Sequence, residues 1–415
     1  MIETPLTALV LSGGGARAAY QVGVLRAVVR LRREALGARS RVFQPFGVIC
    51  GTSAGAINAA ALACQADRFE AAVEVLARVW QSIGSDQVYR SDSLGVLRSG
   101  AQWLTMVSLG WLIARWRRLR PRSLLDNDPL ADLLRRLVPL ERLPMMLATR
   151  QLHAFAVTAS SYTNGTHYTF YSTAQPVRPW VREQRIAVPS PISYDHLLAS
   201  SAIPFVFPAA RIEGTGSAGW FGDGSMRQTA PLSPAIHLGA QRLFIVGVGR
   251  MQEEVANHGD VDSVYPSLAQ VAGHALASIF LDSLSLDVER MLRINRTLAL
   301  LPESALGDTP LRPVEALVIS PSRQIDEIAA RHVGSLPAPV RALLRGVGVG
   351  AGGTVAVRAR GAALASYLLF EAPFTGELIA LGEADTIARS DEVRQFFGWD
   401  RVRRATLARP DIELP

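Results

Sequence analysis

Two short glycine motifs narrow the choice of folds for this chain more than any other part of its sequence. The first motif is Gly13, Gly14 and Gly15, which follow the apolar run of residues 6–11. The second motif follows the apolar run of residues 46–50 and consists of Gly51, Thr52, Ser53, Ala54 and Gly55. Each apolar run is typical of a buried strand, and the residues after each motif have helical periodicity. The repeated pattern predicts an α/β protein in which helices cover both faces of a mostly parallel sheet.

The second motif has the form Gly-x-Ser-x-Gly, which places Ser53 on a tight turn between a strand and a helix. Side chains at positions 51 and 55 would crowd such a turn, so both glycines are needed there. The turn exposes the hydroxyl group of Ser53 at a helix N-terminus, where free N–H groups favour a developing negative charge. We therefore expect Ser53 to be a nucleophile. The alternative is a chance match in a chain with 34 glycines.

The glycine triplet predicts a group of backbone N–H donors that stabilises an oxyanion. Arg17 follows it, and a helix is expected to begin near Ala18, so the loop forms a concavity that attracts anions. A dinucleotide-binding loop is the alternative, because that fingerprint also follows a strand. It needs an acidic residue at the end of a second strand, but Glu34 lies in an arginine-rich stretch with helical periodicity.

Asp223 is the candidate general base. It lies in residues 219–225, where glycines allow close approach of the backbone and two aromatic residues, Trp220 and Phe221, can exclude water. A carboxylate with an ordinary pKa is a weak base for a serine, so the site has to raise that pKa or hold the pair in a short hydrogen bond. The alternative for Asp223 and Gly224 is an ordinary Asx-turn.

The order of a glycine loop, Gly-x-Ser-x-Gly and a downstream Asp-Gly resembles that of bacterial patatin-like phospholipases. Residues 199–204 are similar to the alanine- and serine-rich segment that precedes the aspartate in that family. The resemblance implies a three-layer α/β/α fold with a helical cap and a C-terminal helical extension. It also implies a Ser-Asp dyad of Ser53 and Asp223 that hydrolyses lipid acyl esters without a metal or an organic cofactor. The remaining implied site residues are the oxyanion-hole glycines Gly13, Gly14 and Gly15 and the motif-supporting residues Arg17, Gly51, Gly55 and Gly224.

Two positions depart from the pattern of that family. Ala18 stands where the glycine loop usually closes with glycine, and Ser225 stands where glycine or alanine usually follows Asp-Gly. Both residues are small and leave the backbone roles available. Ala18 would be strained if its position required a positive φ angle.

Other mechanisms and functions stay open at this point. His237, His258, His274 and His332 all follow Asp223, so the residue order of a Ser-Asp-His triad is present. However, Ser53 comes very early for an α/β-hydrolase, whose sheet lays down several strands before its nucleophile. The same acyl-enzyme could also serve an acyltransferase or a thioesterase, and a catalytically silent lipid-binding protein could keep the pocket.

The charge of the chain is carried entirely by arginine on the basic side. All 43 Lys+Arg residues are arginine, which excludes Schiff-base chemistry and a lysine-activated serine. The formal net charge of +7 favours anionic surfaces, but the sequence contains no nucleic-acid-binding motif. One segment predicts contact with a membrane surface, because an apolar run with tryptophans leads into arginines. Its residues are Trp103, Trp111, Arg115, Trp116, Arg117 and Arg118. An ordinary core helix is the equal alternative.

The remaining features concern domains and location. We expect residues 1–320 to form the catalytic domain, residues 69–138 to be a helical cap inserted in it, and residues 321–415 to be an extension packed on the core. The two cysteines, Cys50 and Cys64, form no disulfide framework or metal set. Because no secretory signal or transmembrane span is visible, we expect a cytoplasmic protein that acts at the inner face of the membrane.

Overall fold

A computed structural model describes residues 5–37, 44–91, 123–214, 218–251, 267–346, 348–349 and 362–400. Within these residues the strands form one ten-stranded sheet. The strands are β1 (Thr7–Leu11), β2 (Val48–Thr52), β3 (Ala154–Ser161), β4 (His167–Thr173), β5 (Val181–Arg182), β6 (Arg185–Pro189), β7 (Ala210–Ile212), β8 (Gly219–Asp223), β9 (Arg242–Val246) and β10 (Glu315–Ile319).

The centre of the sheet is parallel and one side of it is mixed. The main order is β10-β9-β1-β2-β3-β4-β6-β5, and the neighbours from β10 to β3 are all parallel. Strand β4 is antiparallel to β3, and β8 pairs antiparallel with both β3 and β7. Every residue of β1 and β2 is buried, as expected for strands covered on both faces. The predicted α/β fold with a mostly parallel sheet is confirmed.

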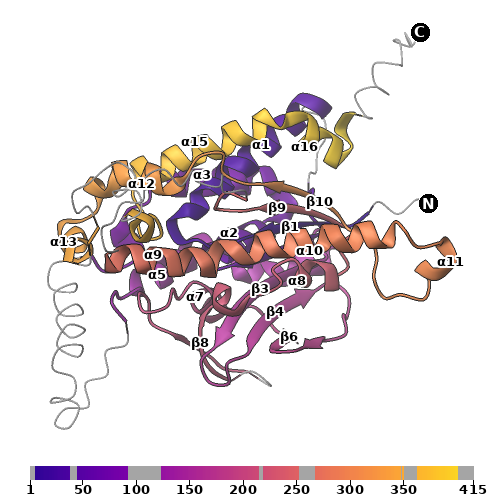
Figure 1. The fold of residues 1–415 in the computed structure, drawn as a ribbon, viewed down its shortest axis with the longest axis horizontal. Helices are drawn as coiled ribbons and strands as arrows, with labels where there is room; N and C mark the ends of the chain where they lie inside the picture. The colour runs from indigo at the N-terminus through magenta and orange to yellow at the C-terminus, as the bar shows by residue number, and fades with distance from the viewer. Residues whose placement is uncertain are drawn as a thin grey trace, which may run out of the picture.

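Helices cover the two faces of the sheet unequally (Figure 1). The larger layer packs on one hydrophobic cluster and includes α1 (Ala19–Leu36), α2 (Ala54–Ala63), α3 (Phe69–Ser82), α12 (Ile325–His332), α15 (Ala372–Ala388) and α16 (Ser390–Phe397). The second face is covered by α8 (Ser233–His237) and α10 (Ser283–Leu298), which pack on a separate cluster. The other helices are α5 (Asp128–Leu137), α6 (Leu143–Ala148), α7 (Tyr194–Ser200), α9 (Leu268–Ala277), α11 (Glu303–Leu306) and α13 (Ala338–Gly346).

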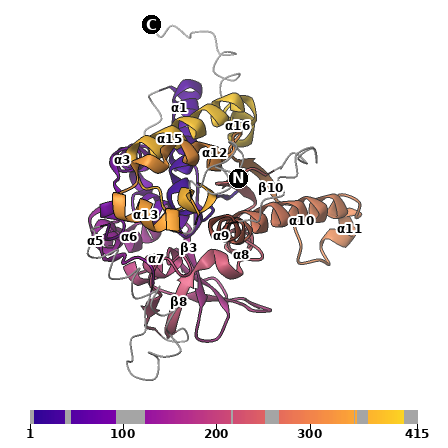
Figure 2. The ribbon, with the colours of Figure 1, turned by 60° about the vertical axis from the view of Figure 1, so that its left-hand side comes forward.

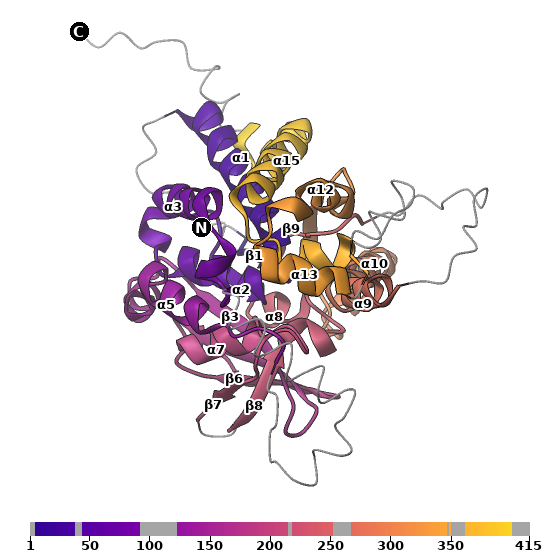
Figure 3. The same cartoon turned by 90° about the vertical axis from the view of Figure 1, so that its left-hand side faces the viewer.

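The C-terminal helices are part of the main layer. Helix α15 lies alongside α1 (Figures 2 and 3), and their packing is the most extensive between any two described helices. Strand β10 extends the sheet next to β9. Helix α3, inside the segment expected to be a cap, packs on α1 and α2. The proposed division at residue 320 and the cap at residues 69–138 stay predictions.

One described helix, Leu268–Leu298, is long and apolar enough by length and composition to cross a membrane. It comprises α9, a short π-helical segment (Ser278–Asp282) and α10. Phe280, Leu284 and Met291 on this helix are buried in the protein. Only 28% of its most apolar 18-residue window is buried, and a single helix of this kind is weak evidence for a membrane span.

Candidate active site

Ser53 occupies the turn between β2 and α2 in a strained backbone conformation, with φ 55° and ψ −133°. Positive φ is uncommon for a residue with a side chain and is often found at functional sites. A Cβ atom at Gly51 would lie 2.5 Å from Cα of Ala56, and one at Gly55 would lie 2.4 Å from the carbonyl oxygen of Ser12. The two glycines therefore permit the tight turn that the motif predicts.

Asp223 lies at the end of β8, where that strand pairs with β3. Its side chain is fully buried, and its Oδ1 accepts a 2.8 Å hydrogen bond from the N–H of Ser225. Its own N–H donates to the carbonyl oxygen of Ala202 over 3.0 Å. The first contact orients the carboxylate, and the second fixes the backbone of Asp223.

The structure brings Ser53 and Asp223 together. Oγ of Ser53 and Oδ2 of Asp223 are both buried, and neither has a partner within ordinary hydrogen-bond geometry. The hydroxyl is nevertheless close enough to the carboxylate to stabilise its charged form. Catalytic hydrogen bonds are often long or poorly aligned before substrate binds, so this geometry suits a base and a nucleophile in the resting state.

Burial raises the pKa of Asp223 to about 7. The Ser53 hydroxyl and the amide and hydroxyl of Ser225 act in the opposite direction, because they donate to the charged form. A base with a pKa near the working pH transfers protons most effectively. The buried setting thus removes the weakness of an ordinary carboxylate as a base.

The aromatic cover of Asp223 differs in part from the sequence expectation. Phe221 is buried beneath the site, but half of the Trp220 side chain is exposed. Tyr162 is equally exposed, but it lies close to the carboxylate: its hydroxyl would be 2.3 Å from a Cβ atom at Gly222, and burial and the charge of Asp223 raise the pKa of that hydroxyl. No local sequence pattern links Tyr162 to Asp223.

The glycine loop lies against the nucleophile. A Cβ atom at Gly13 would be 2.9 Å from Cβ of Ser53 and 2.5 Å from Oγ of Ser225. Within the described part of the chain, the N–H groups of Gly13 and Gly14 have no backbone acceptor. Unpaired backbone N–H groups are the donors from which oxyanion holes are built.

The loop is held in place by Tyr367. The N–H of Ala16 donates to the carbonyl oxygen of Tyr367 over 3.0 Å. Gly15 has φ 55°, and a Cβ atom there would approach the same carbonyl oxygen to 2.2 Å. Ala18 has φ −64°, so alanine at the end of the loop is not strained.

Arg17 connects the loop to the C-terminal region. It is buried, donates from Nε to Oγ of Ser366 over 2.8 Å, forms an ion pair with Asp326, and lies 4.2 Å from the centre of the Tyr367 ring. Its charge is therefore used within the protein. The guanidinium supports the glycine loop and is not available to bind an anion.

Two sets of polar contacts support the site and were not identified from the sequence. Oγ of Ser200, at the end of α7, accepts the N–H of Ser53 over 2.9 Å. Oγ1 of Thr52 lies 2.8 Å from that of Thr158 and 3.0 Å from Oε1 of Gln228. The only sequence signal for Ser200 was its place in the family-like segment of residues 199–204.

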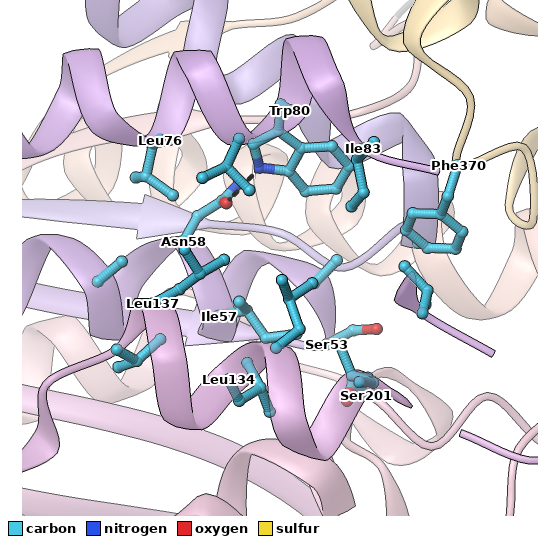
Figure 4. Close-up of a pocket in the computed structure, with 18 of the residues that line it drawn as sticks. Ser53, Ile57, Asn58, Leu76, Trp80, Ile83, Leu134, Leu137, Ser201 and Phe370 are labelled. Carbon is cyan, nitrogen blue, oxygen red and sulfur yellow. Dashed lines mark hydrogen bonds between the residues drawn. The ribbon is translucent and has the colours of Figure 1, made fainter. Parts of the chain in front are cut away.

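An apolar cavity of about 60 Å³ begins at Ser53 and runs between α2, α3 and α5. Figure 4 shows Ser53 beside Ile57 and Ser201, with Trp80 and Ile83 across from them. Asn58 also lines the cavity, but its amide is bonded to Gln21 and to Nε1 of Trp80. The wall therefore offers carbon to a ligand, which suits an acyl chain.

The described histidines do not complete a triad with Asp223. The ring of His167 bonds to the backbone of Gly224, and burial lowers its pKa to about 4. His237 contacts the carbonyl oxygen of Ser233, and His332 contacts Glu377. His274 is exposed on α9, and His258 lies outside the described residues.

Two further expectations can be placed. Among the described residues, no group of three or more histidine, cysteine, aspartate or glutamate side chains could hold a metal ion. The segment expected to contact membranes, with Trp103, Trp111, Arg115, Trp116, Arg117 and Arg118, lies outside the residues that the structure describes.

Comparison with known proteins places the chain in a family. The family model for patatin-like phospholipases matches residues 9–236, which include both glycine motifs and Asp223. A search of curated proteins found no match.

Solved structures give only distant similarities. VipD from Legionella pneumophila is 12% identical, with a TM-score of 0.29, 91% of this chain covered and 67% of that chain. The type III effector protein ExoU is 14% identical, with a TM-score of 0.27 and coverages of 88% and 77%. ExoU of Pseudomonas aeruginosa in complex with SpcU is 20% identical, with a TM-score of 0.19 and coverages of 40% and 34%. The family model alone carries the assignment: the chain belongs to the patatin-like phospholipase family.

Proposed function

We propose that this chain hydrolyses acyl esters of phospholipids or related lipids, with Ser53 as the nucleophile and Asp223 as the general base. One observation carries the proposal: the Ser53 hydroxyl, which lines a carbon-walled cavity, lies close enough to the buried Asp223 carboxylate to stabilise its charged form. Gly13 lies against Ser53, and among the described residues the N–H groups of Gly13 and Gly14 have no backbone acceptor. Together these groups supply a nucleophile, a base and an oxyanion hole.

In the first half-reaction, Oγ of Ser53 gives its proton to Oδ2 of Asp223 and forms a bond to the acyl carbon. The carbonyl oxygen becomes an oxyanion that the N–H groups of Gly13 and Gly14 stabilise. The ester bond to the alcohol then breaks, and the leaving oxygen takes the proton from Asp223. The products are the free alcohol, such as a lysophospholipid, and an acyl group on Ser53.

In the second half-reaction, water attacks the acyl carbon and gives a proton to Asp223. The bond to Oγ breaks, Ser53 regains the proton from Asp223, and the fatty acid leaves. A single carboxylate thus acts as base and then as acid in each half. No histidine is required in this scheme.

The cavity supports a hydrocarbon chain as the part of the substrate that is recognised. Ligand pockets commonly have about 300–1,000 Å³, whereas this cavity has about 60 Å³. We therefore propose that its lining helices separate when a long chain enters. Chain-length preference should then depend on residues of α5 and α2.

The silent-binder alternative is less well supported than hydrolysis. The two departures from the family pattern could have marked decay of the site. Instead, Ala18 has an unstrained φ, and the amide and hydroxyl of Ser225 donate to the charge of Asp223. Both residues fit a working site.

Location and membrane contact rest on the sequence. We propose a cytoplasmic protein that meets the membrane through Trp103, Trp111, Trp116 and the arginines that follow them. The buried free thiols of Cys50 and Cys64 are compatible with a reducing compartment.

The function is tested by release of fatty acid from mixed phospholipid vesicles. We expect activity in the natural chain and a fall of roughly 10³-fold or more in Ser53→Ala. Ser172→Ala is the matched control, because that hydroxyl only donates to the carbonyl oxygen of Ser190. Adding a competing alcohol or thiol distinguishes transfer from hydrolysis. Activity that survives in Ser53→Ala would refute the nucleophile, and a folded natural chain that releases no fatty acid and is not labelled by a fluorophosphonate would favour the binder.

A further inference from the structure

A second cavity lies on the face of the sheet opposite to the one that holds Ser53. It has a volume of about 420 Å³ and lies between α8, α10 and the loop of residues 310–314. Its apolar lining residues Leu232, Met291 and Val314 belong to the hydrophobic cluster beneath α8 and α10. The cavity at Ser53 is lined by the cluster on the other face. The sheet therefore separates the two cavities.

Cationic side chains gather at this second cavity. Arg182 from β5, Arg290 from α10 and Arg312 from the loop line it together with His237. The guanidinium of Arg182 lies 3.4 Å from Nε2 of His237, and that of Arg312 donates to the carbonyl oxygens of Ile236 and Ala240. Within the residues described, neither Arg182 nor Arg312 has a carboxylate partner. Two positive charges at the cavity are thus left without a counterion.

The carboxylate in the described lining, Asp287, is already neutralised. Its Oδ2 accepts the N–H of Leu232 over 3.0 Å, and its Oδ1 accepts from Arg290 over 3.3 Å. Burial raises the pKa of Asp287, while Leu232, Arg290 and the nearby Arg185 act in the opposite direction. Asp287 therefore does not compensate Arg182 or Arg312.

The positive charges at the cavity affect the protonation of His237. Its Nδ1 lies 2.8 Å from the carbonyl oxygen of Ser233, and its ring stacks on Trp180 with centroids 4.7 Å apart. Burial lowers the pKa of His237, and the charges of Arg182, Arg185 and Arg312 lower it further. A bound anion would offset those charges and favour the protonated ring.

We propose that this cavity binds an oxyanion carried on an apolar group, with the anion between Arg182, Arg312 and His237. Guanidinium groups with free N–H donors bind phosphate and carboxylate oxygens in charge-assisted hydrogen bonds. The apolar group would lie on Ile236, Met291 and Leu311, which line the same space. The ligand class is an anionic amphiphile such as an alkyl phosphate, and its site is distinct from the acyl cavity at Ser53.

The test is calorimetric titration of the full chain with octyl phosphate. We expect saturable binding, and Arg182→Gln and Arg312→Gln should each weaken it roughly tenfold, as loss of one charge-assisted hydrogen bond implies. Arg293→Gln is the matched control, since Arg293 lies on α10, pairs with Glu289 and is absent from the cavity lining. Ser53→Ala should bind with unchanged affinity. The NMR signals of His237 should show a higher pKa in the complex.

Several outcomes would overturn the proposal. They are the absence of saturable binding at millimolar octyl phosphate, unchanged affinity in Arg182→Gln, or loss of binding in Ser53→Ala, which would place the ligand in the acyl cavity. Inorganic phosphate that binds as tightly as octyl phosphate would overturn the assignment to an amphiphile. None of these results depends on whether the chain hydrolyses lipids.

Discussion

The cavities on the two faces of the sheet differ in the charged groups around the buried titratable residue near each of them. That residue is Asp223 near one cavity and His237 in the other. At Ser53 the walls are carbon, and the groups that stabilise the Asp223 carboxylate are hydroxyls and an amide rather than cations, so burial raises its pKa to about 7. At His237 arginines surround the cavity and add to the effect of burial, so the pKa of that ring is lowered. Burial alone therefore does not define a site. The charges of the neighbouring groups are the reason why we propose a general base on one face of the sheet and an anion-binding cavity on the other.

The largest expected effect comes from removing the proposed base beside Ser53, Asp223. Asp223→Asn should lower kcat/KM for vesicle hydrolysis roughly 10³-fold or more, because the amide cannot accept the proton of Ser53. The matched control is Asp385→Asn on α15, whose carboxylate likewise accepts a hydroxyl, from Tyr20, and an N–H, from Ser322. The control should lose little activity. Near-full activity in Asp223→Asn would show that Asp223 is not the general base, and the contrast between the two cavities would lose its basis.

The same substitution should stabilise the fold at high pH. The pKa of Asp223 is about 7 in the folded state and about 4 when unfolded, so the charged carboxylate destabilises the folded state above the unfolded pKa. That cost is absent below about pH 4 and is complete above about pH 7. Asp223→Asn should raise the free energy of unfolding at pH 8 by up to about 4 kcal/mol and have little effect at pH 4. Urea denaturation at the two pH values measures this, and a destabilised variant at pH 8 would contradict it.

A smaller effect is expected from a substitution that narrows the carbon-lined cavity at Ser53. Leu137 is partly exposed on α5 and lines the cavity, so Leu137→Phe should be accommodated while it takes space from the acyl chain. We expect kcat/KM for long-chain esters to fall roughly tenfold, with short-chain esters much less affected. Leu137→Met is the volume-matched control. An equal fall for all chain lengths would mean that the cavity does not hold the acyl chain.

The smallest expected effect concerns Ser225. Its hydroxyl stabilises the charged form of Asp223, so Ser225→Ala should raise the pKa of that carboxylate. The midpoint of the increase in kcat/KM with pH should then move to a pH about one unit higher, since a hydrogen bond to a charged group is worth roughly 1.5 kcal/mol. A pH–rate profile measures the shift. An unmoved or lowered midpoint would remove Ser225 from the account of the base.

The parts of the site that the sequence predicted are those encoded over a few residues. The strained turn at Ser53 and the glycine loop at Gly13 are strand, turn and helix patterns with fixed spacing, and the structure has them where they were expected. The central strands were equally visible, because strands buried on both faces are continuous apolar runs. The approach of Asp223 to Ser53 came from the family resemblance and not from spacing.

The parts that were missed depend on contacts between distant segments. Ser200, Tyr162 and the carbonyl oxygen of Tyr367 carry no local signal of their roles, because each acts on a partner far away in the chain. The antiparallel pairing of β8 with β3 is of the same kind. The second cavity is lined by β5, α8, α10 and a loop, so the convergence of its arginines was also invisible in the sequence.

The most direct test of the Ser53 and Asp223 pairing is the rate of fluorophosphonate labelling as a function of pH. The natural chain should be labelled at Ser53 with a rate that rises through about pH 7, as the carboxylate becomes able to accept the proton. Asp223→Asn should be labelled very slowly at every pH, with no such rise. Labelling of Asp223→Asn at the natural rate, with the same dependence on pH, would show that another group activates the serine.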